Sequence, residues 1–316
     1  MRIVVTGALG HIGSRLVPRL ASAFEGCEVV MLDDLSTGRP EVRDALVATP
    51  RCSFVEDDIV ECDLDEAFAG AQAVIHLAAI TNAAGSFAMR DRVERVNLEG
   101  TERVARACAR LGAPLLFPST TSVYGTQADL VDESCAVLRP QSPYAESKLA
   151  AELILARVAA EDGLRFVACR FGTIFGTSPG MRFHTAVNRF CWHAAHGEAL
   201  EAWRETFHQY RPYLDLGDAV RAVEHVVARG VFDGRTYNVL TANATTEEVC
   251  NLIGACVPNA RIEFVDAPLV NQHSYRVARE RFERLGFSFR GNLARGIDET
   301  LAWIRARMQP RQGVAA

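Results

Sequence analysis

The sequence predicts an α/β fold, a doubly wound parallel sheet of the Rossmann type followed by a smaller mixed α/β lobe. Short apolar runs alternate with amphipathic stretches in the first half, a glycine-rich turn joins the first pair, and the alternation stops near residue 172. The 316 residues, 49% of them hydrophobic, are enough for two such units. We expect a first domain over residues 1–172 and a second lobe over 173–316.

The first half supplies the strands and helices of the predicted parallel sheet. Runs rich in Val, Ile, Leu and Phe indicate buried strands at 2–6, 28–33, 52–55, 73–77, 114–118 and 165–170. Parallel pairing needs long crossovers, and helical patterns between the runs provide them at 11–23, 39–48, 88–111 and 143–161.

The second half has no such rhythm, which predicts the mixed lobe. We expect segments near 212–240 to return to the first domain and the tail from Pro310 to fray. The predicted elements are a helix at 182–196, strands at 199–203 and 212–215, a helix at 216–229, a strand at 235–240, a helix at 246–256, a strand at 261–265, and helices at 276–285 and 293–308.

Composition excludes several classes of protein. A net charge of −5 without a basic run argues against nucleic acid, and no apolar stretch is long enough to span a membrane. The nine scattered cysteines read as reduced thiols, and His193 and His196 lack a third metal ligand nearby in sequence, so we expect no metal. The chain starts in a strand pattern without a leader, which predicts a cytoplasmic location.

A glycine-rich turn follows the first predicted strand, with Gly7, Gly10 and Gly13 spaced G-x-x-G-x-x-G. Glycines allow a close backbone approach, and the following helix start offers free N–H groups to a diphosphate. Asp33 ends the second strand, where a carboxylate holds the adenine ribose and repels a 2′-phosphate. This favours NAD, although Arg39 keeps NADP open. The alternative is an ordinary strand-to-helix turn.

Lys148 is the only lysine among the 34 basic residues. It follows Tyr144 by four residues, so both lie on one helix face, about 6 Å apart along the axis. A phenol becomes a base near neutrality only if its pKa falls from about 10 to about 6–7, which an ammonium and a positive nicotinamide ring would favour. Ser119–Ser122 follow the strand at 114–118 and could share a proton with Tyr144. The alternative is a surface pair on an amphipathic helix.

These motifs resemble the extended short-chain dehydrogenase/reductase family, in its NAD-dependent nucleotide-sugar epimerase/dehydratase branch (UDP-glucose 4-epimerase-like). Further markers are His76-Leu77-Ala78-Ala79, Asn97 in its Val-Asn-Leu-Glu-Gly-Thr context, Pro143-Tyr144 and Arg170-Phe171-Gly172. The resemblance implies catalysis by Thr120, Tyr144 and Lys148, with Asn97 as a helix-kinking residue. It implies that NAD contacts Gly7, Leu9, Gly10, His11, Ile12, Gly13, Asp33, Asp58, Ile59, Leu77, Ala78, Ala79, Asn97, Tyr144, Lys148 and Phe171.

The resemblance also implies a nucleotide-sugar substrate, most simply a UDP-sugar, held by the second lobe. Arg211 is expected on the diphosphate, because a guanidinium pairs with phosphate in bidentate fashion; the alternative is a surface arginine. Thr173 stands where many relatives carry a substrate-contacting asparagine, and residues 199–210 lack the usual glycine-rich hairpin. The expected substrate contacts are Thr81, Thr120, Thr121, Thr173, Arg182, His184, Asn188, Arg211 and Arg276.

The residues after Thr120 discriminate between the reactions of such relatives. A 4,6-dehydratase would carry Asp-Glu there, a decarboxylase Glu and a 3,5-epimerase Cys at position 122, whereas this chain has Thr121 and Ser122. This leaves 4-epimerisation by transient oxidation at C4. Dehydration or another NAD(P)-dependent oxidoreduction, and a non-catalytic dinucleotide sensor, remain alternatives.

Two predicted helices, 88–111 and 143–161, carry apolar residues on more than one face, including Val104, Leu153 and Leu155. The resemblance implies that they form a four-helix homodimer interface. The alternative is packing within the core of one chain.

Overall fold

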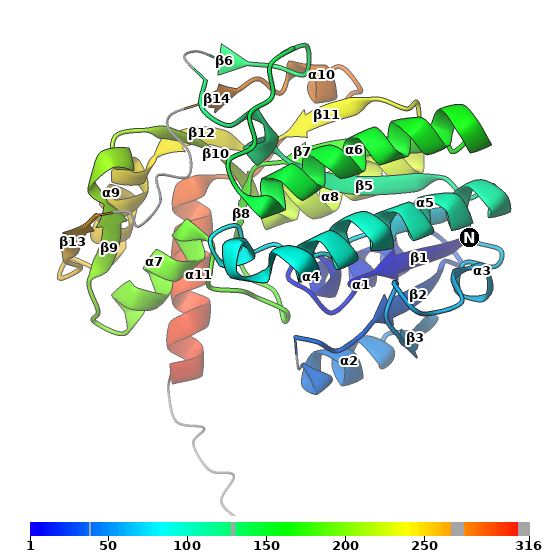
Figure 1. Cartoon of the computed structure of the whole chain (residues 1–316). Coiled ribbons are helices and arrows are strands. Elements are labelled where there is room, and N and C mark those ends of the chain that lie inside the picture. The colour runs from blue at the N-terminus through cyan, green and yellow to red at the C-terminus, as the bar shows by residue number, and fades with distance from the viewer. Residues whose placement is uncertain (38, 128–129, 267–274, 309–316) are drawn as a thin grey trace, which may run out of the picture.

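A computed structural model describes residues 1–37, 39–127, 130–266 and 275–308 (Figure 1). The predicted fraying from Pro310 lies outside these residues. The central sheet has seven parallel strands in the order β11-β7-β5-β4-β1-β2-β3, which confirms the predicted doubly wound fold. They are β1 (Arg2–Thr6), β2 (Glu28–Asp33), β3 (Cys52–Glu56), β4 (Ala73–His76), β5 (Leu115–Thr120), β7 (Phe166–Phe171) and β11 (Thr236–Val239).

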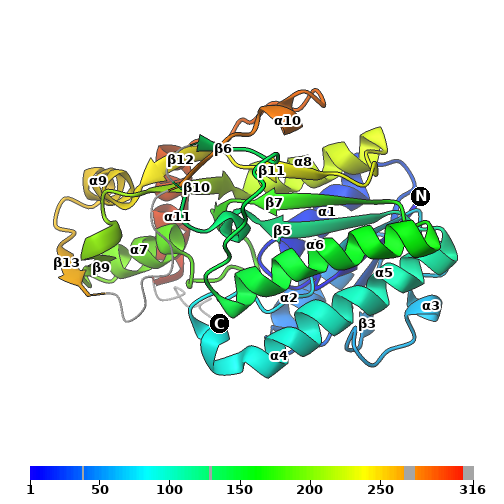
Figure 2. The same cartoon turned by 45° about the horizontal axis from the view of Figure 1, so that its top comes forward.

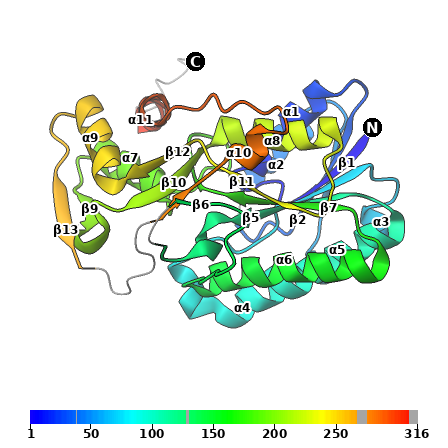
Figure 3. The same ribbon diagram turned by 90° about the horizontal axis from the view of Figure 1, so that it is seen from above.

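Helices cover both faces of this sheet (Figure 3). The chain winds outward from β1 in one direction and from β4 in the other, so the carboxyl ends of these two strands frame a crevice. One face carries α1 (Gly13–Ala23), α2 (Pro40–Val47) and α8 (Leu216–Arg229), and the other carries α3 (Leu64–Ala67), α5 (Gly100–Leu111) and α6 (Pro143–Asp162).

The predicted helix over 88–111 is interrupted in the structure. It consists of α4 (Arg90–Glu94), a π-helical turn over Arg95–Glu99, and α5. Asn97 lies in the turn, and its amide pairs with both backbone groups of Ile80 and with the Ser147 hydroxyl. The side chain thus ties the irregular turn to the loop after β4 and to α6, in agreement with its expected structural role.

The second lobe has a small sheet and three helices, at the left of Figure 1. The sheet order is β12-β10-β8, and β9 pairs with β13 beside it. Phe175, Phe190, Tyr213 and Ile297 form the centre of its core. Its elements are β8 (Thr173–Phe175), α7 (Ala186–Ala195), β9 (Leu200–Trp203), β10 (Tyr210–Asp215), β12 (Ala242–Thr245), α9 (Thr246–Cys256), β13 (Ile262–Val265) and α11 (Leu293–Met308).

The predicted helix over 276–285 is wrong at its start. Arg276–Val277 form β14, which pairs with β6 (Leu130–Val131), and only α10 (Glu280–Glu283) is helical. The backbone groups of Val277 bond to the Asn243 side chain, and its own side chain is buried. Tertiary pairing therefore overrides the local helical pattern.

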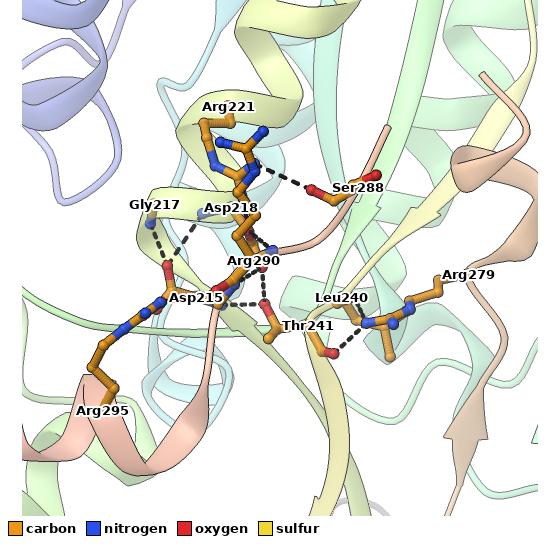
Figure 4. A network of polar contacts seen from close by, with 11 residues as sticks. Asp215, Gly217, Asp218, Arg221, Leu240, Thr241, Arg279, Ser288, Arg290 and Arg295 are labelled. Atoms are coloured by element: carbon orange, nitrogen blue, oxygen red, sulfur yellow. Dashed lines mark hydrogen bonds and ion pairs between the residues drawn. The ribbon is translucent and has the colours of Figure 1, made fainter. Parts of the chain in front are cut away.

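A closed polar network holds the carboxyl end of β10 (Figure 4). Asp215 caps α8 by accepting from the backbone N–H groups of Gly217 and Asp218. The Asp218 carboxylate is fully buried and accepts from the Thr241 hydroxyl, the Arg221 guanidinium, and the backbone N–H groups of Arg290 and Gly291. This network joins α8, the β11–β12 turn and the segment before α11.

Among the described residues, no helix combines the length and apolarity needed to cross a bilayer. The same residues contain no cluster of His, Cys, Asp and Glu side chains arranged to hold a metal ion.

Candidate active site

Two glycines of the glycine turn, Gly7 and Gly13, pack too closely against their neighbours to be replaced by a residue with a side chain. Gly7 has a φ of +65°, and a Cβ there would lie 2.5 Å from the Ala78 nitrogen. A Cβ on Gly13 would lie 2.4 Å from the Ala8 carbonyl oxygen. Because α1 begins at Gly13, the turn presents the helix N-terminus to the crevice, as binding of a diphosphate requires.

Asp33 ends β2 beside this turn and is held by backbone donors. The Leu9 and Leu35 N–H groups each donate to its carboxylate, at 3.0 Å. Burial raises the pKa of Asp33, although these two hydrogen bonds lower it. Leu9 therefore serves the site through its backbone, and its apolar side chain is buried in the core.

A cavity of about 470 Å³ runs from the glycine turn into the second lobe. It contains most of the residues that the sequence assigned to the site. Those that line it are Gly7, Gly10, His11, Ile12, Gly13, Asp33, Asp58, Ile59, Leu77, Ala78, Ala79, Thr81, Thr120, Tyr144, Lys148, Phe171, Thr173, Arg182, His184 and Arg211.

Tyr144 and Thr120 meet where β5 ends and α6 begins. Ser142 caps α6 by accepting from the Ala145 N–H group, and Pro143 fixes the first helical position, which places Tyr144 in the first turn. The Thr120 hydroxyl caps the 3-10 turn over Thr121–Tyr124 by accepting from the Ser122 N–H group, and it also pairs with the Tyr144 phenol.

Lys148 lies one helical turn beyond Tyr144 and is buried. Its ammonium donates to the Pro118 carbonyl at 2.8 Å and lies 4.4 Å from the centre of the Phe117 ring. Burial lowers the pKa of Lys148 to about 7, while the nearby Glu152 carboxylate raises it.

The protein's own groups do not ionise Tyr144. Burial raises the pKa of its phenol to about 12, and the Thr120 hydrogen bond only partly opposes this effect. The expected low phenol pKa therefore needs more positive charge than the chain provides. A bound dinucleotide would have to supply the remainder, as a positive charge favours the phenolate.

A buried layer behind Lys148 escaped the sequence analysis. Glu152 accepts from the Ser119 hydroxyl and from the Arg170 guanidinium at 2.9 and 2.7 Å. Both charged side chains are less than one-tenth exposed. The signal was present in part, because Glu152 follows Lys148 by four residues and so shares its helix face.

Five expected site residues do not line the cavity. Asn97 and Leu9 act as described above, and the Thr121 hydroxyl donates to the Phe171 carbonyl. Asn188 is fully buried and pairs with both backbone groups of Gly176 and with the Arg182 carbonyl. The Arg276 side chain lies over the Tyr210 ring at 5.5 Å. The expected ligand contacts of these five residues stay predictions.

The second lobe adds cavity residues that the sequence did not assign. Arg189 comes from α7, Glu201 and Trp203 lie on β9, and Thr246 begins α9. Leu200 and Ala202 are buried, so the alternation of β9 turns Glu201 and Trp203 to its other face. That alternation could have identified them, but only once β9 was known to border the cavity.

Comparison with known proteins decides the family. Residues 3–239, more than half of the chain, match the model of the NAD dependent epimerase/dehydratase family. The chain belongs to this family. NAD is therefore its cofactor, as the glycine turn and Asp33 predicted, and the backbone cradle at Gly7 and Gly13 fits a diphosphate.

Relatives within the family carry different activities. The UDP-glucose 4-epimerase of Mycolicibacterium smegmatis is 31% identical over 98% of this chain and 100% of its own. A trifunctional UDP-glucose 4,6-dehydratase/3,5-epimerase/reductase of Arabidopsis thaliana is 28% identical over 95% of this chain, which spans about half of that protein, 46%. The structure of MoeE5 in complex with UDP-glucuronic acid and NAD aligns with a TM-score of 0.86 and 27% identity, over 98% of this chain and 100% of that one.

Proposed function

We propose that this family member is a nucleotide-sugar 4-epimerase that acts on a UDP-hexose with NAD retained in the site. The observation that carries the proposal is the composition of the cavity wall around Tyr144. Among the described residues, the wall formed by β5, its following turn, α6 and β7 contains Thr120, Ser122, Tyr144 and Lys148 but no carboxylate or thiol. Elimination of water and epimerisation next to the ketone both need a further acid or base beside Tyr144, for which relatives use a carboxylate or thiol on this wall, whereas oxidation and reduction at one carbon do not.

The chain's residues have distinct tasks in this reaction. The Tyr144 oxygen, paired with the Thr120 hydroxyl, takes the proton of the sugar hydroxyl and later returns it. Lys148 is fixed on the Pro118 carbonyl and adds positive charge to the same wall. Bound NAD⁺ supplies the acceptor of the hydride and then its donor. Inversion follows when the ketone presents its other face.

We assign the nucleotide end of the substrate to the second lobe. Arg211 lines the cavity from β10, and burial lowers its pKa, so an anionic ligand would stabilise its charged form. Thr173 and His184 also line this cavity. We therefore place the diphosphate at Arg211 and the sugar between it and Tyr144.

The proposal is tested by incubating the purified chain with UDP-glucose, UDP-glucuronic acid, UDP-N-acetylglucosamine and dTDP-glucose without added NAD(H). NMR and mass spectrometry should detect an isomer of equal mass from at least one UDP-sugar. Loss of one water would instead identify a dehydratase, the activity named for several relatives at similar identity. Stoichiometric consumption of added NAD(P)H would identify a net oxidoreductase.

We also propose a homodimer through α5 and α6. These helices lie side by side along one edge of the molecule (Figure 2), and Leu153 of α6 is 66% exposed there. Burial of this leucine against a second copy would remove its apolar surface from water. Light scattering should give twice the chain mass, and Leu153→Asp should give the monomer.

A further inference from the structure

A segment of the second lobe crosses the glycine turn of the first domain. This strap, residues 177–182, lies between β8 and α7. The Arg15 guanidinium donates to the Thr177 carbonyl at 2.8 Å, and the Gly180 N–H group donates to the buried Ser14 hydroxyl at 2.8 Å. The Ser178 hydroxyl pairs with Nδ1 of His11 at 3.0 Å. The strap is thus hydrogen-bonded to the turn and to the first residues of α1.

Gly180 sets how closely the strap can approach. A Cβ at this position would lie 2.4 Å from the Leu9 carbonyl oxygen and 2.5 Å from that of Gly10. Contacts this short exclude any side chain, so backbone meets backbone. Arg39 holds the other side of the strap by donating to the carbonyls of Pro179 and Met181, at 3.4 and 2.7 Å.

Arg182, the last residue of the strap, brings a guanidinium to the glycine turn. Its Nη2 lies 3.8 Å from the position that a Cβ would take on Gly10, and its Nη1 donates to the Thr81 hydroxyl at 3.2 Å. Burial lowers the pKa of Arg182, and the neighbouring Arg39 lowers it further. No carboxylate of the described residues forms an ion pair with it, so its charge is compensated only weakly, by the more distant Asp33.

His11 provides a second, independent sign of a ligand at this place. It lines the cavity inside the turn, and its Nε2 atom is buried without a hydrogen-bond partner among the described residues. Nδ1 is already paired with Ser178. A buried polar atom is costly to leave unpaired, so a ligand that pairs with it is favoured.

We propose that the strap is part of the dinucleotide site and that Arg182 binds the diphosphate of the bound dinucleotide. A guanidinium matches phosphate oxygens in bidentate fashion, and here it faces the same point as the N-terminus of α1. The sequence suggested Arg182 as a sugar contact, but its place over Gly10 puts it on the dinucleotide side of the cavity. The inference rests on NAD binding by this family and not on the epimerase reaction.

The test compares Arg182→Gln with Arg189→Gln, a matched change of another arginine that lines the same cavity from α7. Calorimetry would measure the affinities for NAD, for ADP, which carries the diphosphate, and for adenosine, which lacks it. Arg182→Gln should weaken NAD and ADP about tenfold or more, as expected for a lost charged hydrogen bond, and leave adenosine unchanged. Arg189→Gln should leave all three affinities unchanged.

Gly180→Ala tests the strap while leaving the arginine in place. The added Cβ should push the strap from the turn and weaken NAD and ADP as well, with circular dichroism confirming the fold. The proposal is overturned if Arg182→Gln keeps wild-type affinity for NAD and ADP, or weakens adenosine equally. It is also overturned if the variant impairs only a carboxylate-bearing sugar such as UDP-glucuronic acid, because Arg182 would then bind the sugar. A chain that fails to epimerise any sugar would leave these binding results interpretable.

Discussion

Two polar clusters lie at the carboxyl ends of strands, and they differ in where their hydrogen-bonding capacity points. The closed cluster lies at the carboxyl end of β10, where donors of the chain satisfy the Asp218 carboxylate entirely (Figure 4). The open cluster lies at the end of β5, where Thr120, Tyr144 and Lys148 line a cavity. The comparison shows that burial of polar groups alone does not mark a functional site. A functional site is marked by polar side chains whose hydrogen-bonding groups face a cavity that a ligand can enter.

The most damaging change at the open cluster should be Tyr144→Phe. It removes the proton acceptor without changing the packing volume, so we expect kcat to fall by about 10²–10⁴. Affinity for NAD and the melting temperature should stay near wild type, as measured by calorimetry and thermal unfolding.

Tyr124→Phe is the matched control, because the Tyr124 phenol is buried and donates to the Asn238 side chain at 2.8 Å. It should lower stability and leave the rate within a few-fold. Equal losses of rate in both variants would mean that Tyr144 has no special chemical role.

The largest effect on the closed cluster should come from Asp218→Ala. It removes the acceptor of the Arg290 and Gly291 N–H groups, the Thr241 hydroxyl and the Arg221 guanidinium. Breaking such a buried charged network should reduce the free energy of unfolding by about 3–5 kcal/mol, measured in urea. The KM for the UDP-sugar, measured at saturating NAD, should not change in the folded fraction.

Glu224→Gln serves as its control. This carboxylate pairs with Arg19, whose side chain is half exposed, so the loss should stay below about 1 kcal/mol. A similar loss in both variants would contradict the view that the buried Asp218 network contributes more to stability than an exposed ion pair does.

The sequence could predict features that depend on short-range patterns, but not those that depend on packing between distant segments. The glycine turn, the Tyr144–Lys148 spacing and the parallel strands follow from short-range patterns, because each depends on neighbours within a few residues. Arg189, Glu201 and Trp203 join the cavity only through packing of the second lobe, which no local pattern encodes. The mistaken start of the helix at 276–285 has the same cause, since Asn243 and β6 reach it from far along the chain.

Glu152→Gln tests whether the Glu152 carboxylate controls the pKa of Lys148 or only maintains the packing behind it. The Glu152 carboxylate raises the pKa of Lys148 against burial, which lowers it to about 7. Without that charge the pKa of Lys148 falls further, so less of the ammonium survives at pH 8. The alkaline limb of kcat should move to lower pH, with a loss on the order of tenfold at pH 8, since one pKa unit is tenfold.

The pH profile distinguishes this effect from simple loss of structure. Glu146→Gln, on the same helix but half exposed and paired with Arg90, should leave the profile in place. A uniform loss of rate at every pH in Glu152→Gln would show that the carboxylate only maintains packing with Arg170.

The smallest expected effect concerns the choice of dinucleotide. Asp33→Asn removes the negative charge at the end of β2, and it should raise the affinity for NADP relative to NAD about fivefold, since one charge pair at 4 Å in water is worth about 1 kcal/mol. The gain stays modest because Arg39, the basic residue nearest in sequence, donates to the strap carbonyls of Pro179 and Met181 instead of facing a 2′-phosphate. Competitive binding would measure the ratio, with Asp34→Asn as control because that exposed carboxylate accepts only from the Ser36 N–H group among the described residues. An equal change in both variants would show that bulk charge, and not the position of Asp33, selects the cofactor.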